Sequence, residues 1–286
     1  MPDPLLGWVY ASGPLRAMRI LVGSAALVRL ATLIPQLRAA ADPATAEPLV
    51  WGGLVTAWTW PLLAAMWALG AMALVVGRRT SLGAGLLALT VLVLLGADAN
   101  LRWSHLYVLG LAATIIAAGG RSFDGARRGP GGAPQVPGWP VLVVRIQVSI
   151  IYGFAGLAKV NEDFVSGLVL FENLAGSVTA GWLPPQVAAS PVALTTLAVA
   201  VICAELWLAA GLWVTRWFFA NLAVAVVLHA GMLLLARDGQ EALHFALFAV
   251  LMWALVLAFR YPLRRCPASG HGLVGSAGFE PAASRV

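Results

Sequence analysis

The sequence predicts an all-α integral membrane protein, a polytopic bundle of about eight transmembrane helices with both termini in the cytoplasm. Of its 286 residues, 60% are hydrophobic and only 10% are charged, which is more apolar surface than one water-soluble core can hide. The apolar residues also form long runs that each approach the thickness of a bilayer. The charges between these runs alternate in sign along the chain, as the loops of a multi-pass protein do.

The apolar runs are the expected helices. Arg16 and Arg19 precede the first run, as in a signal peptide, but no small-residue cleavage site follows, so we expect this run to be retained. Several runs are close to the shortest length that spans a bilayer, which leaves the expected count open by about one helix. The runs cover residues 17–37, 56–77, 81–97, 103–120, 139–159, 191–214, 217–236 and 242–259.

The connections between the runs predict the orientation. Arginines gather before the first run and after the second, fourth, sixth and eighth, whereas acidic residues gather at the alternate connections. The positive-inside rule makes the arginine-rich side cytoplasmic. We therefore expect a multi-pass protein of the plasma membrane, whose partner is the surrounding lipid bilayer. Because the arginines lie singly or in small groups between apolar runs, nucleic-acid binding is excluded.

One domain is expected over residues 1–265. Its halves, 16–120 and 139–259, are joined by residues 121–138, whose Gly, Pro and Arg content is typical of a flexible cytoplasmic linker. Residues 266–286 lack periodicity and are expected to be a disordered tail. We hypothesise that this tail is read-through into a neighbouring gene, since its Gly-Phe-Glu-Pro can be encoded by the core of a transfer-RNA T-loop.

The longest outer connection, residues 160–190, is not uniformly polar. The segments Phe164–Phe171 and Trp182–Pro185 are rich in apolar and aromatic residues. Such segments are typical of the membrane interface. We therefore expect a short amphipathic or re-entrant segment there.

Four ionisable side chains from four different runs are expected in the outer half of the bundle: His105, Lys159, His229 and His244. An ionisable group in or beside a bilayer is by default a functional-site hypothesis, and these four can converge on one outward-facing pocket. Their position on one side disfavours a transporter, and they form no convincing metal-ligand set. For each residue alone the simpler explanations stay open, namely a lysine that extends to the headgroups and histidines that lie at the interface or bridge helices.

One face of the fifth run carries three of the polar residues. Arg145, Tyr152 and Lys159 recur at intervals of seven and therefore lie close to one stripe, which we expect to face the bundle. A phenol and a desolvated amine on one wall of an apolar pocket can bind and deprotonate an acidic organic hydroxyl. Glu205 is a deep carboxylate in the sixth run and needs a partner, such as a histidine or Arg145.

The residues around Lys159 resemble the signature of the HTTM family, the horizontally transferred transmembrane domain. The best-known member of that family is vitamin K-dependent gamma-glutamyl carboxylase. The family pattern has a tyrosine, an Ala-Gly pair, a lysine three residues on, an aromatic residue five further and a glycine three after that. The same spacing is present here in Tyr152, Ala155, Gly156, Lys159, Phe164 and Gly167, with Phe164 in place of the usual tryptophan.

Two further segments support the resemblance. His105, Tyr107, Gly110 and Leu111 match a His-x-Tyr-x-x-Gly-Leu segment of the family, and His229 lies near the start of the C-terminal helix pair. Together the matches span about residues 16–259. The resemblance therefore covers nearly the whole membrane region.

The resemblance implies a quinol-dependent, carboxylase-like enzyme whose active face is outward. It implies that Lys159 is the base that deprotonates a reduced isoprenoid quinone, similar to vitamin K hydroquinone, and that His105 assists carboxylation. His229 is the third expected catalytic residue. The residues expected to contact the substrate are Tyr152, Tyr107, Glu205 and His244.

The substrate of such an enzyme would be a secreted peptide or protein. The carboxylase recognises its protein substrates through a large lumenal region, for which we expect no room in this chain. The alternative is a non-catalytic membrane partner in the maturation, export or immunity of a secreted peptide. Related bacterial proteins that are encoded with secreted peptide toxins have been implicated in such roles.

Overall fold

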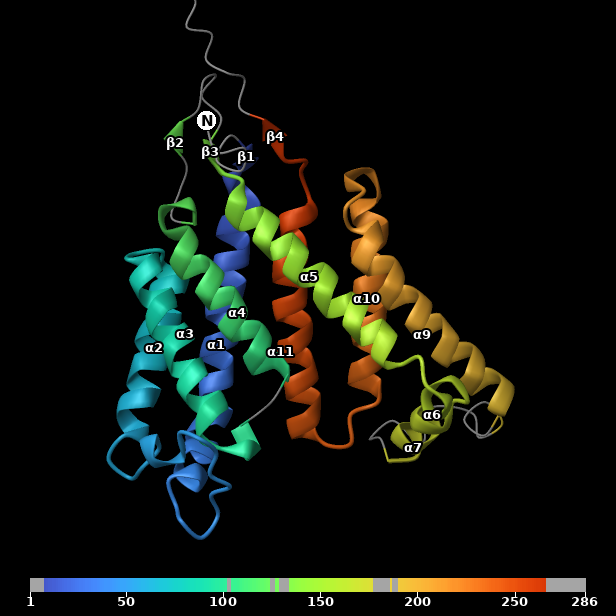
Figure 1. The fold of residues 1–286 in the computed structure, drawn as a ribbon, viewed down its shortest axis with the longest axis horizontal. Helices are drawn as coiled ribbons and strands as arrows, with labels where there is room; N and C mark the ends of the chain where they lie inside the picture. Colours follow the sequence, from blue (N-terminus) through green and yellow to red (C-terminus); the bar gives the residue numbers. More distant parts are fainter. Residues whose placement is uncertain are drawn as a thin grey trace, which may run out of the picture.

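Eight apolar helices of 16 residues or more stand side by side in the computed structural model (Figure 1). The structure describes residues 8–101, 104–123, 127–128, 134–176, 186 and 190–265. Each of the eight helices coincides with one of the predicted apolar runs to within a few residues. They are α1 (Ser12–Ala40), α2 (Trp60–Val76), α3 (Thr80–Ala97), α4 (Ser104–Gly119), α5 (Trp139–Ala158), α9 (Pro191–Gly211), α10 (Phe218–Leu234) and α11 (Gly239–Val256).

The helix ends follow from local sequence. Pro61, Pro140 and Pro191 occupy the first helical positions of α2, α5 and α9, where a missing N–H is not needed. Asp238 caps α11, because its Oδ1 accepts from the Glu241 amide at 2.8 Å. Gly77 ends α2 in the left-handed region, with φ 79°, a conformation that suits glycine.

The expected number of spans needs correction. Six described helices are long and apolar enough to cross a membrane, namely α1, α3, α5, α9, α10 with its preceding turn, and α11 with its following turn. The other two predicted spans, 56–77 and 103–120, form α2 and α4, which have only 17 and 16 residues. Among the described residues, 56–59 form a loop and turn before α2 and Gly77 ends it, while Gly120 begins the turn that follows α4. About six spans therefore replace the predicted eight, and the all-α polytopic class is confirmed.

The helices pack mainly against their neighbours in sequence, and α11 joins the two halves. The series α1 to α4 packs as successive antiparallel pairs, while α5 packs along α9. α11 inserts beside α1 and α4 and also contacts α10 (Figure 1). Residues from both halves thus share one core, with Trp67, Leu74 and Leu87 buried in the first half and Leu208 and Leu255 in the second.

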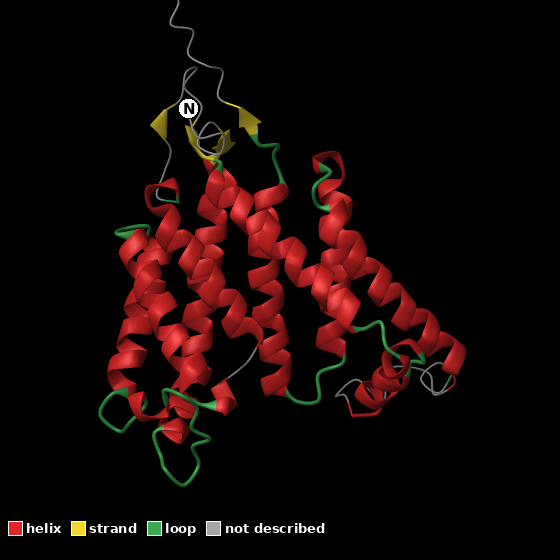
Figure 2. Ribbon diagram, in the orientation of Figure 1, coloured by secondary structure: helices red, strands yellow, loops and turns green. Residues whose placement is uncertain are grey.

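A small sheet lies at one end of the bundle (Figure 2). Its strands are β1 (Trp8–Ala11), β2 (Arg127–Arg128), β3 (Pro134–Pro137) and β4 (Arg264–Arg265), in the order β2-β3-β1-β4 and all antiparallel. Since β1 pairs with β4, both ends of the described chain lie at this end, which we call the sheet end. The opposite end is called the distal end.

Tyr10 anchors the sheet to the bundle. Its hydroxyl donates to the Leu257 carbonyl at 3.2 Å, and its ring meets Tyr261 edge-on at 6.3 Å. Burial raises the pKa of Tyr10 to about 12, so the phenol stays protonated and keeps donating at physiological pH.

The two long connections contain short elements. Within the predicted linker, the described residues form β2, β3 and the turn η3 (Gly120–Ser122). The outer connection forms α6 (Glu162–Val165) and α7 (Leu168–Gly176) at the distal end (Figure 1), where the sequence predicts a short amphipathic or re-entrant segment. Residues 182–185 and the predicted tail 266–286 lie outside the described residues. The other 3-10 turns are η1 (Gly52–Leu54), η2 (Ala99–Leu101), η4 (Thr215–Trp217) and η5 (Leu257–Phe259).

Arg145 holds the sheet end together. This arginine of α5 is only 4% exposed and donates through Nε and Nη2 to the Ala258 carbonyl at 2.9 and 2.8 Å, and also to the Tyr261 carbonyl. It therefore supplies donors to carbonyls of the segment that follows α11, one in the turn η5 and one just after it. The predicted inward stripe is confirmed at this residue, but its role is structural.

Replacement of Arg145 by methionine is expected to destabilise the fold by roughly 2–4 kcal/mol, because buried carbonyls lose their donors. The measurement is the thermal unfolding of the purified protein. Arg78→Met is the matched control, since Arg78 is exposed. Equal melting temperatures for the two variants would show that Arg145 is not needed for this packing.

Candidate functional site

The end of α5 meets α9 in an ion pair. Lys159 Nζ lies 2.9 Å from both carboxylate oxygens of Glu205 and donates to the Ala155 carbonyl at 3.2 Å. The Glu205 side chain is 7% exposed and that of Lys159 is 28% exposed. Lys159 therefore turns into the bundle instead of extending to the headgroups. Glu205 has its partner in Lys159, not in a histidine or Arg145.

Gly156 makes this pair possible. A side chain at this position would meet Leu206 Cδ2 at 2.9 Å and Glu205 Cβ at 3.3 Å. With only a hydrogen there, α5 approaches α9 closely enough for the lysine one turn later to reach the carboxylate. The Ala-Gly pair and the lysine of the sequence signature thus act as one geometric unit.

Two ring side chains lie on α5 and on the neighbouring part of the second half, α10. Tyr152 and His229, from α5 and α10, are 3% and 2% exposed and stack with their ring centroids 6.0 Å apart. Neither the Tyr152 hydroxyl nor Nδ1 of His229 has a hydrogen-bond partner among the described residues. Unpaired polar atoms of this kind cost free energy when they are buried, so they indicate a place where a ligand or water supplies the partner.

Lys159, Glu205, Tyr152 and His229 are called the Lys159 cluster below. Tyr152 lies about two turns before Lys159 on α5, so one helix carries both the ion pair and the ring pair. On the far side of His229, α11 contributes Phe248, edge-on at 5.6 Å, and Trp253 at 6.1 Å. The cluster therefore combines an acid–base pair, the unpaired polar atoms of Tyr152 and His229, and an aromatic wall whose Trp253 Nε1 likewise has no partner among the described residues.

The other two histidines belong to a second group. His105 of α4 and His244 of α11 stack at 4.8 Å, and Nε2 of His105 accepts from Arg29 Nε of α1 at 2.9 Å. Arg29, His105 and His244 are 1%, 1% and 3% exposed and are called the Arg29 cluster below. The four predicted ionisable residues are thus divided between two clusters, both of which involve helix segments on the distal side.

Arg29 was missed by the sequence analysis. It is a charged residue within the apolar run 17–37, and an intramembrane charge is itself a functional signal.

Tyr107 was expected to contact the substrate, but this residue is 47% exposed on α4. Residues two apart on a helix point in different directions, so the structure does not bring Tyr107 to either cluster.

The described residues contain no group of three His, Cys, Asp or Glu side chains placed to hold a metal ion. A pocket lined by Ala40, Pro43, Pro48 and Val55 lies beyond the end of α1. It contains no member of either cluster.

The fold and these clusters define a polytopic helical membrane protein with buried ionisable groups toward one end. The family model described as HTTM domain matches residues 8–259, which is most of the chain. The chain therefore belongs to the HTTM family, and the resemblance predicted from the Lys159 signature is confirmed. No curated protein and no solved structure matches the chain.

The last glycine of the signature also has a structural reason. Gly167 adopts φ +85° between α6 and α7, and a side chain there would meet Leu194 Cβ at 2.6 Å and the Thr195 amide nitrogen at 3.0 Å. Only glycine combines this backbone conformation with such a close approach to α9. Gly167 thus fixes the segment that follows Lys159.

Substitution of Gly167 by alanine is expected to destabilise the protein by at least about 1 kcal/mol, because alanine is disfavoured in the left-handed region and its methyl group collides with α9. Thermal unfolding measures the loss. The control is Gly231→Ala, since a side chain at Gly231 meets nothing within 4 Å and alanine favours a helix. A Gly167→Ala protein as stable as this control would contradict the packing described.

Proposed function

We propose that this HTTM-family protein is a membrane enzyme that deprotonates and oxidises an isoprenoid quinol at the Lys159 cluster. The observation that carries the proposal is the pair of unpartnered buried atoms, the Tyr152 hydroxyl and Nδ1 of His229, beside an acid–base pair. A quinol hydroxyl can both donate and accept, so it can satisfy both atoms. The apolar surroundings suit the rings and the isoprenoid chain.

The ion pair supplies the base. One proton that moves across the 2.9 Å contact from Lys159 to Glu205 converts the charged pair into a neutral amine and a carboxylic acid. A ligand that covers the partly exposed Lys159 removes water from the pair and favours this neutral form. The Lys159 amine then takes the proton of the quinol hydroxyl, and the resulting ammonium lies beside the new anion.

The quinol supplies the electrons, and dioxygen is the oxidant. In the balanced reaction, one quinol and one dioxygen give one quinone epoxide and one water, as the family resemblance implies. Tyr152 and His229 orient the reacting hydroxyl, while the aromatic side chains Phe248 and Trp253 exclude water from it. Carboxylation of a secreted peptide or protein is a further step that the resemblance implies for the same outward face.

A binding experiment tests the central requirement, that the hydroxyl is recognised. A short-chain naphthoquinol and its dimethyl ether are titrated under anaerobic conditions into the protein in nanodiscs, and quenching of tryptophan fluorescence is followed. The quinol is expected to bind saturably and at least tenfold more tightly than the ether, which cannot donate to the site. Equal affinities would contradict hydroxyl recognition. Absence of saturable binding would also contradict the proposal and would favour the non-catalytic peptide partner.

A further inference from the structure

Arg29 is a buried cation whose side-chain partners are all neutral. Besides His105 Nε2, its guanidinium donates to Thr32 Oγ1 at 2.6 Å and to Gln36 Oε1. Within the described part of the chain, no carboxylate lies within ion-pair distance of it, in contrast to Lys159 with Glu205. A buried charge without an opposite charge is costly, so the fold holds Arg29 in a place that favours an added anion.

The neighbouring acidic residues have other roles. Asp238 and Glu241 lie at the start of α11, the helix of His244, and Asp238 caps this helix through the Glu241 amide. The Glu241 carboxylate in turn accepts from the Arg237 amide at 2.7 Å. Each of these hydrogen bonds uses one carboxylate oxygen, and among the described residues neither carboxylate lies within ion-pair distance of Arg29.

The histidines do not neutralise it either. Because His105 Nε2 accepts from Arg29, this ring is neutral with its proton on Nδ1. The stacked ring of His244 adds a second flat, polarisable surface. The three hydrogen bonds that Arg29 donates use Nε and one hydrogen on each terminal nitrogen, which leaves one N–H on each terminal nitrogen for another acceptor.

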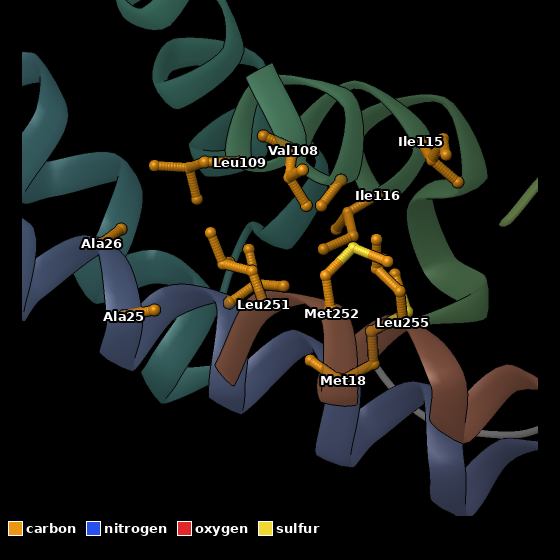
Figure 3. Close-up of a cluster of buried hydrophobic side chains, with 14 of the residues drawn as sticks. Met18, Ala25, Ala26, Val108, Leu109, Ile115, Ile116, Leu251, Met252 and Leu255 are labelled. Atoms are coloured by element: carbon orange, nitrogen blue, oxygen red, sulfur yellow. The ribbon is translucent and has the colours of Figure 1, made fainter. Parts of the chain in front are cut away.

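The cluster is closed toward the sheet end. Figure 3 shows apolar side chains of α1, α4 and α11 packed together. They include Ala25, Val108 and Leu251, which are almost fully buried and follow the cluster in the direction of the sheet end on each helix. An anion that reaches Arg29 therefore enters from the distal end, the same end at which Lys159 terminates α5.

We propose that the Arg29 cluster binds one planar, singly charged carboxylate, either of an organic acid or of bicarbonate. A guanidinium matches the flat carboxylate through paired N–H donors, and a single negative charge balances the single positive charge of Arg29. This second site does not depend on quinol chemistry at the Lys159 cluster. It gives the protein a place for an anionic reactant that the two histidines flank.

The test uses acetate as the probe and saturation-transfer difference NMR as the readout, on the whole protein in nanodiscs of phosphatidylcholine at constant ionic strength. The wild type is expected to give a saturable acetate signal, and Arg29→Gln is expected to weaken acetate binding at least tenfold. Arg19→Gln is the matched control, because Arg19 is a buried arginine of the same helix near the sheet end. This control is expected to bind acetate like the wild type.

Arg29→Lys keeps the charge in case Arg29→Gln does not fold, and it too is expected to weaken binding, since an ammonium lacks the paired donors. Unchanged acetate affinity in whichever Arg29 variant folds would overturn the inference, as would a wild type without a saturable signal. Competition by bicarbonate distinguishes bicarbonate from an organic acid as the source. Stronger competition by dimethyl phosphate than by formate would assign the site to a phosphodiester headgroup and overturn the carboxylate assignment.

Discussion

Replacement of Lys159 by methionine is expected to abolish quinol oxidation and to destabilise the protein by about 3 kcal/mol. The activity is lost because no amine remains to accept the quinol proton. The stability falls because the Glu205 side chain, 7% exposed, becomes a buried carboxylate without its cation. This expected loss of stability lies at the lower end of the range for broken buried ion pairs, because Lys159 is partly exposed. Oxygen consumption and thermal unfolding measure the two effects.

The double variant Lys159→Met/Glu205→Leu separates these effects. Removal of both charges leaves no unpaired ion, so its stability is expected to return to within about 1 kcal/mol of the wild type. Its activity is expected to stay absent. If the double variant regained activity together with stability, Lys159 would be a structural residue and the base assignment would fail.

Replacement of Tyr152 by phenylalanine is expected to leave the protein as stable as the wild type, or slightly more stable, while it slows quinol oxidation roughly 100-fold. The hydroxyl that is removed has no hydrogen-bond partner in the described residues. Its removal therefore also removes the free-energy cost of burying an unpaired hydroxyl. In the proposed mechanism the same hydroxyl orients the substrate, so its loss is expected to cost about 3 kcal/mol of transition-state stabilisation. A gain in stability with a loss of function is typical of an active-site residue.

Tyr107→Phe is the matched control for this prediction. Tyr107 is 47% exposed and lies outside both clusters, so neither stability nor turnover is expected to change. The measurements are the melting temperature and kcat/KM of both variants in the same nanodiscs. A Tyr152→Phe protein with lower stability and unchanged kcat/KM would assign Tyr152 to packing alone.

The positions of the helices were predictable because hydropathy is a local property. Each apolar run contains its own signal, and the prolines at the starts of α5 and α9 mark where the helix begins. The span count was less predictable, because it depends on how much of a run stays helical. In α2 the left-handed Gly77 and the turns before Trp60 shorten the helix, although the apolar run continues through these positions.

The site was predictable only in part, because partners across helices are not local. The stripe of Arg145, Tyr152 and Lys159 follows from helical spacing, but the Lys159–Glu205 pair joins residues 46 positions apart. The approach at Gly156 that creates the pair depends on how α5 crosses α9. The Arg29–His105 contact likewise joins residues 76 positions apart, so the division into two clusters became visible only in the fold.

The most direct measurement is quinol turnover by the purified protein in nanodiscs, with oxygen consumption and epoxide followed together by mass spectrometry. The wild type is expected to form one epoxide for each dioxygen consumed, and the folded Lys159→Met/Glu205→Leu variant is expected to form none. Equal epoxide formation by the two proteins, or none by a folded wild type that binds the quinol, would contradict an oxidation that depends on Lys159.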